Sequence, residues 1–357
     1  MIKIDKLFVS LLPSKHGGAG DYLDEILKYY SDYSKIIVPN FLKGIWILNR
    51  FLIIFFKNLY KFYLTLLLKF FSVNKLVIFH AQTISYKLSA LLLLNSKDIE
   101  FYILDTNFFC KKSYNEYLGK PCFRCFEFFN PFQDCNHHPY YSNDIDYKKF
   151  IDAIKYSEKK ITFIVQTKGY EKLLINKYPL AKVKILKMKH DGLIYNNQKQ
   201  NWNIKNDKIL NDFFFHAHLT NPKGLKYFLE LSKKMSDKKF ILPGYKEFSE
   251  LTNNVVIKKI SWGEVFIEEL KKSKIILCPS VWTYPVESAL IKSMLLKKAV
   301  AIIDIQNSFS KEIPNDCVIK LKGEVDNDSN TLNFFLNNNN YLQIANNGFN
   351  WAKNYLK

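Results

Sequence analysis

Short apolar runs alternate along the chain with stretches in which apolar residues recur at helical spacing. In the first half, the runs that predict strands cover residues 4–9, 75–79, 101–104, 161–165 and 183–186. Residues 83–94, between two of these runs, predict a helix. Strand and helix in repeated alternation are typical of a parallel sheet covered by helices.

The same alternation restarts in the second half, after a polar linker candidate at residues 195–207. The predicted strands there cover residues 212–216, 240–242, 255–260, 275–278 and 299–303, and the predicted helices cover residues 224–235, 263–272 and 286–296. The pattern therefore predicts an α/β protein with two Rossmann-like, doubly wound domains facing a cleft. We place them at residues 1–195 and 208–340, and we expect a terminal helix at 341–357 to pack back toward the N-terminal domain.

The longest apolar stretch covers residues 45–71 and contains Arg50, Lys57, Lys61 and Lys69. A membrane-spanning helix needs about 20 residues with few charges, so these cations argue against a span. At 100° per residue the first three cations fall within about 40° of one another. We expect one or two amphipathic helices with a basic stripe, either in the protein core with solvated lysines or on a membrane surface.

The chain has 357 residues and a formal net charge of +19, carried mostly by Lys. An acidic partner such as a membrane surface or a phosphorylated substrate fits this charge, and a solvated Lys-rich surface fits it equally well. We expect no nucleic-acid partner, because no module of interleaved aromatic and basic residues is present. The first apolar run follows no signal-peptide pattern, which favours a cytoplasmic location.

Three segments carry candidate ligand-binding chemistry. Gly17, Gly18 and Gly20 are predicted to form a turn after the first strand, with Asp21 capping the helix that follows, where free backbone amides favour anions. Lys223 precedes Gly224 at the start of the first helix of the second half. The segment 278–294 ends a buried strand at Pro-Ser and opens another helix, which suits a diphosphate.

The order of these motifs resembles the two-domain GT-B glycosyltransferases, and most closely the retaining family-4 type that uses nucleotide-diphosphate sugars. The resemblance implies that Lys223 binds the donor diphosphate and that Asp105 matches the second residue of a His-Asp pair. It also matches His190-Asp191-Gly192 to the Pro-His-Gly segment that the family has before its linker. The further residues that it places near donor or phosphate are Gly17, Gly18, Gly20, His218, Ser280, Tyr284, Glu287, Ser288, Ala289 and Lys292.

Two departures from the family pattern bear on catalysis. The family's two glutamates fall on Tyr284 and Lys292, neither of which accepts a hydrogen bond as a carboxylate does. Glu287 is the candidate to replace one of them, and Leu104 stands where the family has its His. The expected function is therefore a glycosyltransferase, with Lys223, Glu287 and Asp105 as catalytic residues and no catalytic metal. A non-catalytic GT-B-like protein that binds a glycan or a partner is the alternative.

The resemblance also implies the substrates and the place of action. We expect a nucleotide-sugar donor, a polysaccharide or lipid-linked glycan acceptor, transfer with retention, and a site at the inner face of the plasma membrane. The apolar stretch at 45–71 is the segment that we expect to dock there.

Four cysteines cluster in an insertion at residues 110–138 of the N-terminal domain. Cys110, Cys122, Cys125 and Cys135 include a CxxC pair, and four thiolates suit a tetrahedral zinc site. Structural zinc and free thiols both fit this spacing, and no open catalytic position is implied.

Overall fold

The computed structural model describes residues 2–12, 17–37, 46–128, 144–187, 208–245, 251–261 and 263–356. The chain forms two compact units. The first unit contains Met1–Tyr114 and Phe123–His190, and the second contains Asn115–Cys122 and Asp191–Lys357. A short segment of the first half therefore belongs to the second unit. The predicted linker at 195–207 lies outside the described residues.

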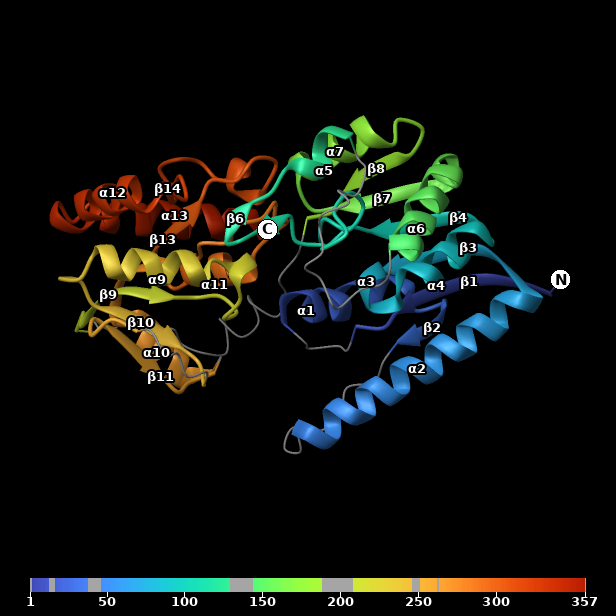
Figure 1. Cartoon of the computed structure of the whole chain (residues 1–357), viewed down its shortest axis with the longest axis horizontal. Coiled ribbons are helices and arrows are strands. Elements are labelled where there is room, and N and C mark those ends of the chain that lie inside the picture. The colour runs from blue at the N-terminus through green and yellow to red at the C-terminus, as the bar shows by residue number, and fades with distance from the viewer. Residues whose placement is uncertain are drawn as a thin grey trace. The chain divides into compact units, whose positions relative to one another are not determined.

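The first unit is built on a parallel sheet of six strands in the order β2-β1-β3-β4-β7-β8 (Figure 1). The strands are β1 (Ile2–Ser10), β2 (Ser34–Ile37), β3 (Phe71–Phe79), β4 (Ser96–Tyr102), β7 (Ile161–Val165) and β8 (Lys182–Ile185). β1 lies between β2 and β3, so the strand order reverses beside β1. The carboxyl ends of β3 and β4 are adjacent, because Phe79 pairs with Tyr102.

The helices of the first unit connect these parallel strands. They are α1 (Gly17–Ile26), α2 (Trp46–Phe70), α3 (Ala81–Ile84), α4 (Tyr86–Leu94), α5 (Arg124–Phe128), α6 (Asp144–Tyr156) and α7 (Lys168–Lys177). α4 lies between α2 and α6 and contacts both. The helix predicted at 83–94 is interrupted at Ser85, whose φ of 97° ends α3 and whose hydroxyl accepts a hydrogen bond from Leu88 N at the start of α4.

The second unit repeats this design with a parallel sheet in the order β11-β10-β9-β12-β13-β14. The strands are β9 (Asn211–Phe215), β10 (Phe240–Pro243), β11 (Val255–Lys258), β12 (Ser273–Leu277), β13 (Ala299–Ile303) and β14 (Ile319–Leu321). All five residues of β13 are buried, because helices cover both faces of a parallel sheet. The predicted α/β class of two doubly wound domains is thereby confirmed.

The helices of the second unit are α9 (Leu225–Lys234), α10 (Glu264–Lys271), α11 (Ser288–Leu295), α12 (Val325–Asn337) and α13 (Tyr341–Tyr355). α13 packs on α11 and β13 of its own unit. Its Gly348 lies so close to this surface that a Cβ would stand 2.7 Å from Cys317 O. The buried residues of α13, which include Ile344, Ala345, Gly348 and Ala352, are small or apolar. The expectation that residues 341–357 also pack toward the N-terminal domain stays a prediction.

Candidate functional site

The turn before α9 is held tightly against the end of β12. Gly224 adopts a φ of 82°, and a Cβ at this position would lie 2.0 Å from Pro279 O. Only glycine fits both constraints. Val281 N also donates to Pro222 O at 2.9 Å. The Lys-Gly motif of the sequence therefore places the Lys223 backbone beside the loop that follows β12.

Lys223 is brought together with Glu287 by this packing. Its ammonium donates to Glu287 Oε1, and the Nζ atom lies 5.2 Å from the centre of the Trp282 ring. The side chains of Lys223 and Glu287 are 19 % and 6 % exposed. Glu287 Oε2 is buried without a hydrogen-bond partner among the described residues. We call Lys223, Trp282 and Glu287 the lysine–glutamate group.

The chemistry of the lysine–glutamate group suits an anionic ligand that also carries hydroxyls. A half-buried ammonium attracts phosphate more strongly than an exposed one, because less water screens the charge. Glu287 is the N-cap residue of α11, so the free amides of Ser288 and Ala289 lie at the same place. The unpartnered oxygen of Glu287 is an acceptor for a ligand hydroxyl.

The other residues predicted in the second unit have different environments. Ser280 is fully buried with an unpartnered hydroxyl among the described residues, whereas His218 is exposed. Tyr284 is 1 % exposed, and its backbone oxygen accepts a hydrogen bond from Phe309 N. The side chain of Tyr284 is therefore buried, and its predicted role near the donor stays a prediction.

His216 precedes His218 by two residues and lies in the same region of the second unit. His216 follows β9 directly, and its Nδ1 atom lies 2.8 Å from Oγ of Ser293 in α11. Burial, together with the positive charges of Lys292 and His218, lowers the pKa of His216 to about 3. His216 is therefore neutral at physiological pH, and Lys292 is the cation beside it.

In the first unit, Asp105 is joined by a histidine from the neighbouring strand. His80 follows β3 in a left-handed conformation with φ 62°, and its Nε2 atom lies 3.9 Å from Asp105 Oδ2. The sequence has Leu104 where the resemblance expects a His, and the fold brings His80 to the carboxylate instead. A sequence signal existed, since both residues follow adjacent strands at their carboxyl ends.

Three polar atoms at this place are buried without partners among the described residues: His80 Nδ1, Gln82 Nε2 and Asp105 Oδ2. Burial raises the pKa of Asp105 to about 7, although a hydrogen bond from Asn107 N to Oδ1 at 2.9 Å opposes this shift. Burial, with the charge of Lys57, lowers the pKa of His80 to about 4. We call His80, Gln82 and Asp105 the histidine–aspartate group. Its donors and acceptors suit a neutral hydroxyl ligand.

The glycines of the first unit lie inside a helix. α1 begins at Gly17, so Gly17, Gly18 and Gly20 form its first turns and Asp21 does not cap it. The predicted turn at these glycines is corrected accordingly. The free amides of the helix N-terminus are therefore those of Gly17 and its successors. The motif predicted near His190 lies outside the described residues.

The cysteine cluster is described only in part. Cys110 and Cys125 are buried in the first unit, and Cys122 belongs to the second. No group of three or more metal-ligating side chains occurs among the described residues. Cys135 lies outside them. The three described cysteines therefore do not by themselves form a tetrahedral site.

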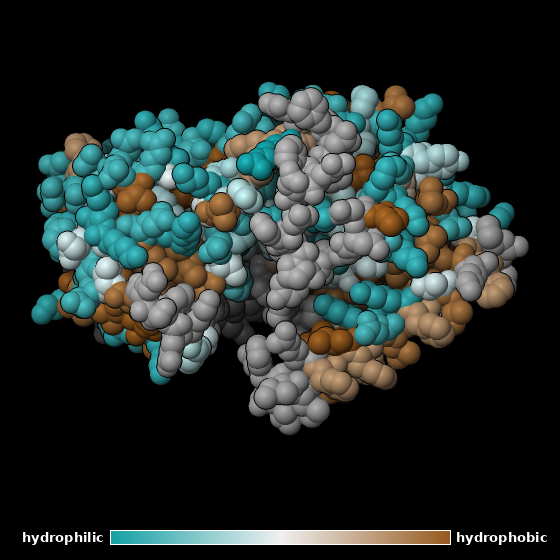
Figure 2. Space-filling view, viewed as in Figure 1, coloured by the Kyte–Doolittle hydropathy of each residue, from teal (hydrophilic) through white to brown (hydrophobic). Residues whose placement is uncertain are grey.

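α2 has an unusual distribution of side chains. Its exposed residues are mostly large and apolar, and they form a brown and tan band along the helix (Figure 2). They are Phe51, Ile54, Phe55, Leu59, Phe62, Tyr63, Leu66 and Phe70. Lys57 and Lys61 instead lie on a half-buried stripe, and burial lowers the pKa of both ammonium groups. We call the eight exposed residues the apolar face of α2.

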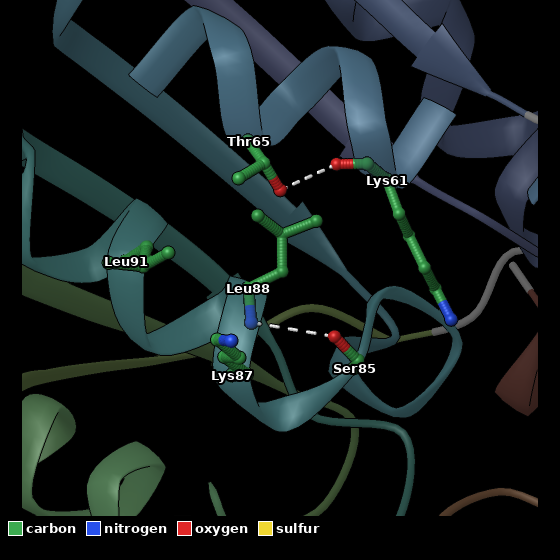
Figure 3. A pocket seen from close by; sticks show the side chains of 6 residues that line it. All are labelled: Lys61, Thr65, Ser85, Lys87, Leu88 and Leu91. Carbon is green, nitrogen blue, oxygen red and sulfur yellow. Dashed lines mark hydrogen bonds between the residues drawn. The ribbon is translucent and has the colours of Figure 1, made fainter. Parts of the chain in front are cut away.

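A groove runs between α2 and the start of α4, beside Lys61 of the lysine stripe (Figure 3). Its lining residues are Lys61, Thr65, Ser85, Lys87, Leu88 and Leu91. In the part of the chain that the structure describes, α2 is the one helix long and apolar enough to cross a membrane, with Phe51–Leu68 only 17 % buried.

No family model and no curated protein matches this sequence. Solved structures nevertheless share its fold. HepE from Anabaena, in complex with UDP, has a TM-score of 0.59 at 12 % identity, covering 100 % of this chain and 96 % of HepE. Sucrose-phosphate synthase from Thermosynechococcus elongatus has a TM-score of 0.64 at 9 % identity, covering 100 % and 95 %. A glycosyltransferase from Rickettsia africae has a TM-score of 0.52 at 14 % identity, covering 99 % and 94 %. The chain therefore has the predicted GT-B fold.

Proposed function

We propose that this protein is a retaining glycosyltransferase of the family-4 type that uses a nucleotide-diphosphate sugar. The observation that carries the proposal is the lysine–glutamate group at the N-terminus of α11, which offers a cation, free amides and an unpartnered carboxylate oxygen. HepE, which has the same fold, was crystallised with UDP and with UDP-glucose. A diphosphate and a ribose together match the chemistry of this group.

Transfer with retention needs few groups from the protein. The bond between the sugar C1 atom and the diphosphate oxygen breaks, and the acceptor oxygen bonds to C1 on the same face. The acceptor proton passes to the departing phosphate. The protein mainly orients the two substrates and stabilises charge that develops on the leaving group.

Lys223 is the residue that we assign to this stabilisation. A bound diphosphate competes with Glu287 for the Lys223 ammonium. The Glu287 carboxylate is then free to accept hydrogen bonds from the ribose hydroxyls. The amides at Ser288 and Ala289 add further donors. Because Lys223 already supplies a cation there, we expect no divalent ion to be required.

We assign the acceptor hydroxyl to the histidine–aspartate group of the first unit. Asp105 Oδ2 and His80 Nδ1 are buried and unpartnered within the described part of the chain, so a hydroxyl satisfies them at little cost. The acceptor that we propose is a cell-surface polysaccharide or a lipid-linked glycan.

A hydrolysis and transfer screen tests the enzyme proposal. The whole chain is incubated with purified UDP- and GDP-sugars, alone and with glycan acceptors, and nucleotide release is measured. We expect release from one donor class, and reduced release in Lys223→Ala and Glu287→Gln. Absence of calorimetric binding of any donor at millimolar concentration would contradict the proposal.

We further propose that the apolar face of α2 lies on an anionic membrane at the cytoplasmic side of the cell. Large apolar side chains point away from the protein, so the helix is inverted relative to a helix of a water-soluble domain. The net charge of +19 favours an anionic surface. Attachment there would bring the protein to a lipid-linked acceptor.

The alternative is a non-catalytic protein that binds a glycan or a partner. Tyr284 and Lys292 favour this alternative, because they stand at the positions of the family's two glutamates and neither supplies a carboxylate. Tyr284 is buried, and Lys292 lies beside His216. Nucleotide-sugar binding without turnover, in every donor and acceptor combination, would decide for this alternative. Structural zinc stays a separate proposal, tested by the metal content of the purified chain.

A further inference from the structure

The segment Asn115–Cys122 leaves the first unit, joins the second, and then returns. It forms a small hairpin in which β5 (Glu116–Tyr117) pairs with β6 (Lys120–Pro121). Leu118 and Gly119 both have positive φ, at 52° and 84°, as a two-residue hairpin turn requires. We call these eight residues the crossing hairpin.

The crossing hairpin packs on the start of α9. A Cβ at Gly119 would lie 2.9 Å from the Lys226 side chain, and Lys226 Nζ donates to Leu118 O at 3.4 Å. Cys122 N donates to Asn115 O at 2.7 Å and closes the hairpin at its base. The hairpin therefore contacts a residue three positions after Lys223.

Asn115 makes the most specific contact of the hairpin. Its Oδ1 atom accepts a hydrogen bond from Thr283 N at 2.7 Å, and its Nδ2 atom donates to Thr283 Oγ1 at 3.1 Å. Thr283 Oγ1 in turn donates to Gln306 O at 3.2 Å. Asn115 and Thr283 are 1 % and 0 % exposed. Such a pair needs one donor and one acceptor on a short side chain, which Asn supplies.

Thr283 belongs to the loop that carries Trp282 and Glu287 of the lysine–glutamate group. It follows Trp282, whose ring lies 5.2 Å from Lys223 Nζ, and precedes Glu287 by four residues. The loop is fixed on one side by Pro222 and on the other by Asn115. Without Asn115, the buried Thr283 amide loses the hydrogen bond to Asn115 Oδ1, and the Thr283 hydroxyl loses the bond from Asn115 Nδ2 while it keeps the one to Gln306 O. Loss of a hydrogen bond to a buried amide is costly in a packed loop.

We infer that Asn115 is a positioning residue for the nucleotide site, supplied by the N-terminal half of the sequence to the C-terminal unit. This inference rests on the proposed function for its ligand, a nucleoside diphosphate. The crossing hairpin holds the 279–287 loop in the conformation that presents Trp282 and Glu287 to Lys223.

The test compares the wild-type whole chain with Asn115→Leu, which is close to Asn in size but has no polar side-chain atoms, and Asn115→Asp, which keeps the acceptor for Thr283 N. Lys120→Gln, at an exposed position of the same hairpin, is the control. Two quantities are measured: hydrogen exchange of residues 279–287 without ligand, and the calorimetric Kd for UDP.

We expect Asn115→Leu to speed exchange of the loop about tenfold and to raise the Kd for UDP about tenfold. Asn115→Asp should lie between this variant and wild type, and Lys120→Gln should match wild type. Unchanged exchange in Asn115→Leu overturns the inference, and so does faster exchange with an unchanged Kd.

The two proposals fail in different ways. If wild type binds no UDP or other nucleoside diphosphate, the proposed function fails, and the exchange data alone decide whether Asn115 holds the loop. If Asn115→Leu does not fold, Asn115→Ala takes its place, because its smaller side chain leaves room for water at Thr283.

Discussion

The two units use the same sheet design and build opposite kinds of polar group on it. The lysine–glutamate group of the second unit is a charged pair, with an ammonium bonded to a carboxylate. The histidine–aspartate group of the first unit carries only a partial charge near pH 7, because burial raises the pKa of Asp105 to about 7 and lowers that of His80 to about 4. Full charge suits a diphosphate, and a partial charge suits a sugar hydroxyl.

The surfaces of the units differ as well. The first unit exposes eight large apolar side chains on a single helix, α2. In the second unit the described large apolar residues that are exposed are scattered along the sequence, apart from the neighbours Ile209 and Leu210. They are Leu118, Ile209, Leu210, Tyr245, Val265, Phe334 and Leu342. Scattered apolar residues are ordinary on a soluble surface, whereas a continuous row requires a partner. This contrast agrees with our proposals of phosphate binding by the second unit and membrane attachment by the first.

Removal of the Lys223 ammonium should have the largest effect. We expect Lys223→Ala to lower turnover of the nucleotide sugar about 100-fold or more, because loss of one charge-stabilising donor typically costs that much. The measurement is steady-state nucleotide release. Lys234→Ala removes a surface ion pair with Asp326 at the other end of α9 and should retain wild-type turnover. Equal rates in wild type and Lys223→Ala would show that the Lys223 ammonium does not stabilise the leaving diphosphate.

A charge on the apolar face of α2 should weaken membrane binding by a smaller factor. Phe55→Asp removes a side chain that is 53 % exposed, and loss of about 2 kcal/mol of apolar transfer corresponds to about 30-fold in partition. Sedimentation with vesicles of phosphatidylcholine and phosphatidylglycerol measures it. Tyr156→Asp makes the same change at an exposed aromatic residue of α6 and should bind like wild type. Equal losses in both variants would argue against a specific face.

The pH dependence sharpens the contrast between the two groups. With a pKa of about 7, Asp105 is mostly protonated at pH 6 and mostly ionised at pH 8. If its carboxylate holds the acceptor, kcat/KM for the acceptor should rise about tenfold between these values. Asp105→Asn should be slow and independent of pH over the same range. A wild-type profile that is flat between pH 6 and 8 would contradict this role.

The same pKa has a consequence for stability, and its sign is fixed. The folded pKa lies above the unfolded value of 3.8, so the folded protein binds more protons between pH 4 and 7. The contribution of Asp105 to the free energy of unfolding therefore falls as pH rises through this window. Denaturant titrations should show a smaller decline in Asp105→Asn. His80 and His216 act in the opposite direction, because their pKa values lie below 6.5.

Chelation should have the smallest effect. We expect EDTA to leave nucleotide release unchanged within about twofold, since Lys223 supplies the cation that we assign to the leaving group. Restoration of lost activity by Mg²⁺ or Mn²⁺ would contradict this expectation. Zinc released into the chelator without loss of activity would instead support the proposed structural zinc.

The strands were predictable because both faces of a parallel sheet are covered, which turns each strand into an apolar run. The runs at 161–165 and 299–303 coincide with β7 and β13. The short edge strands β2 and β14 were not predicted, since four or three residues give little periodicity. The break at Ser85 and the helical position of Gly17 depend on local backbone conformation that the apolar pattern does not report.

The sequence by itself determined the two α/β halves, the Lys-Gly turn at 223–224 and the apolar character of residues 46–70. It also identified Asp105 as a candidate site residue. Each of these depends on local pattern or on residue chemistry. Tertiary structure decided which side chains meet. It paired Lys223 with Glu287, brought His80 to Asp105, turned the apolar face of α2 outward, and attached Asn115 to Thr283 across 168 residues of sequence. Contacts at such separation depend on strand order and packing, which no local pattern encodes.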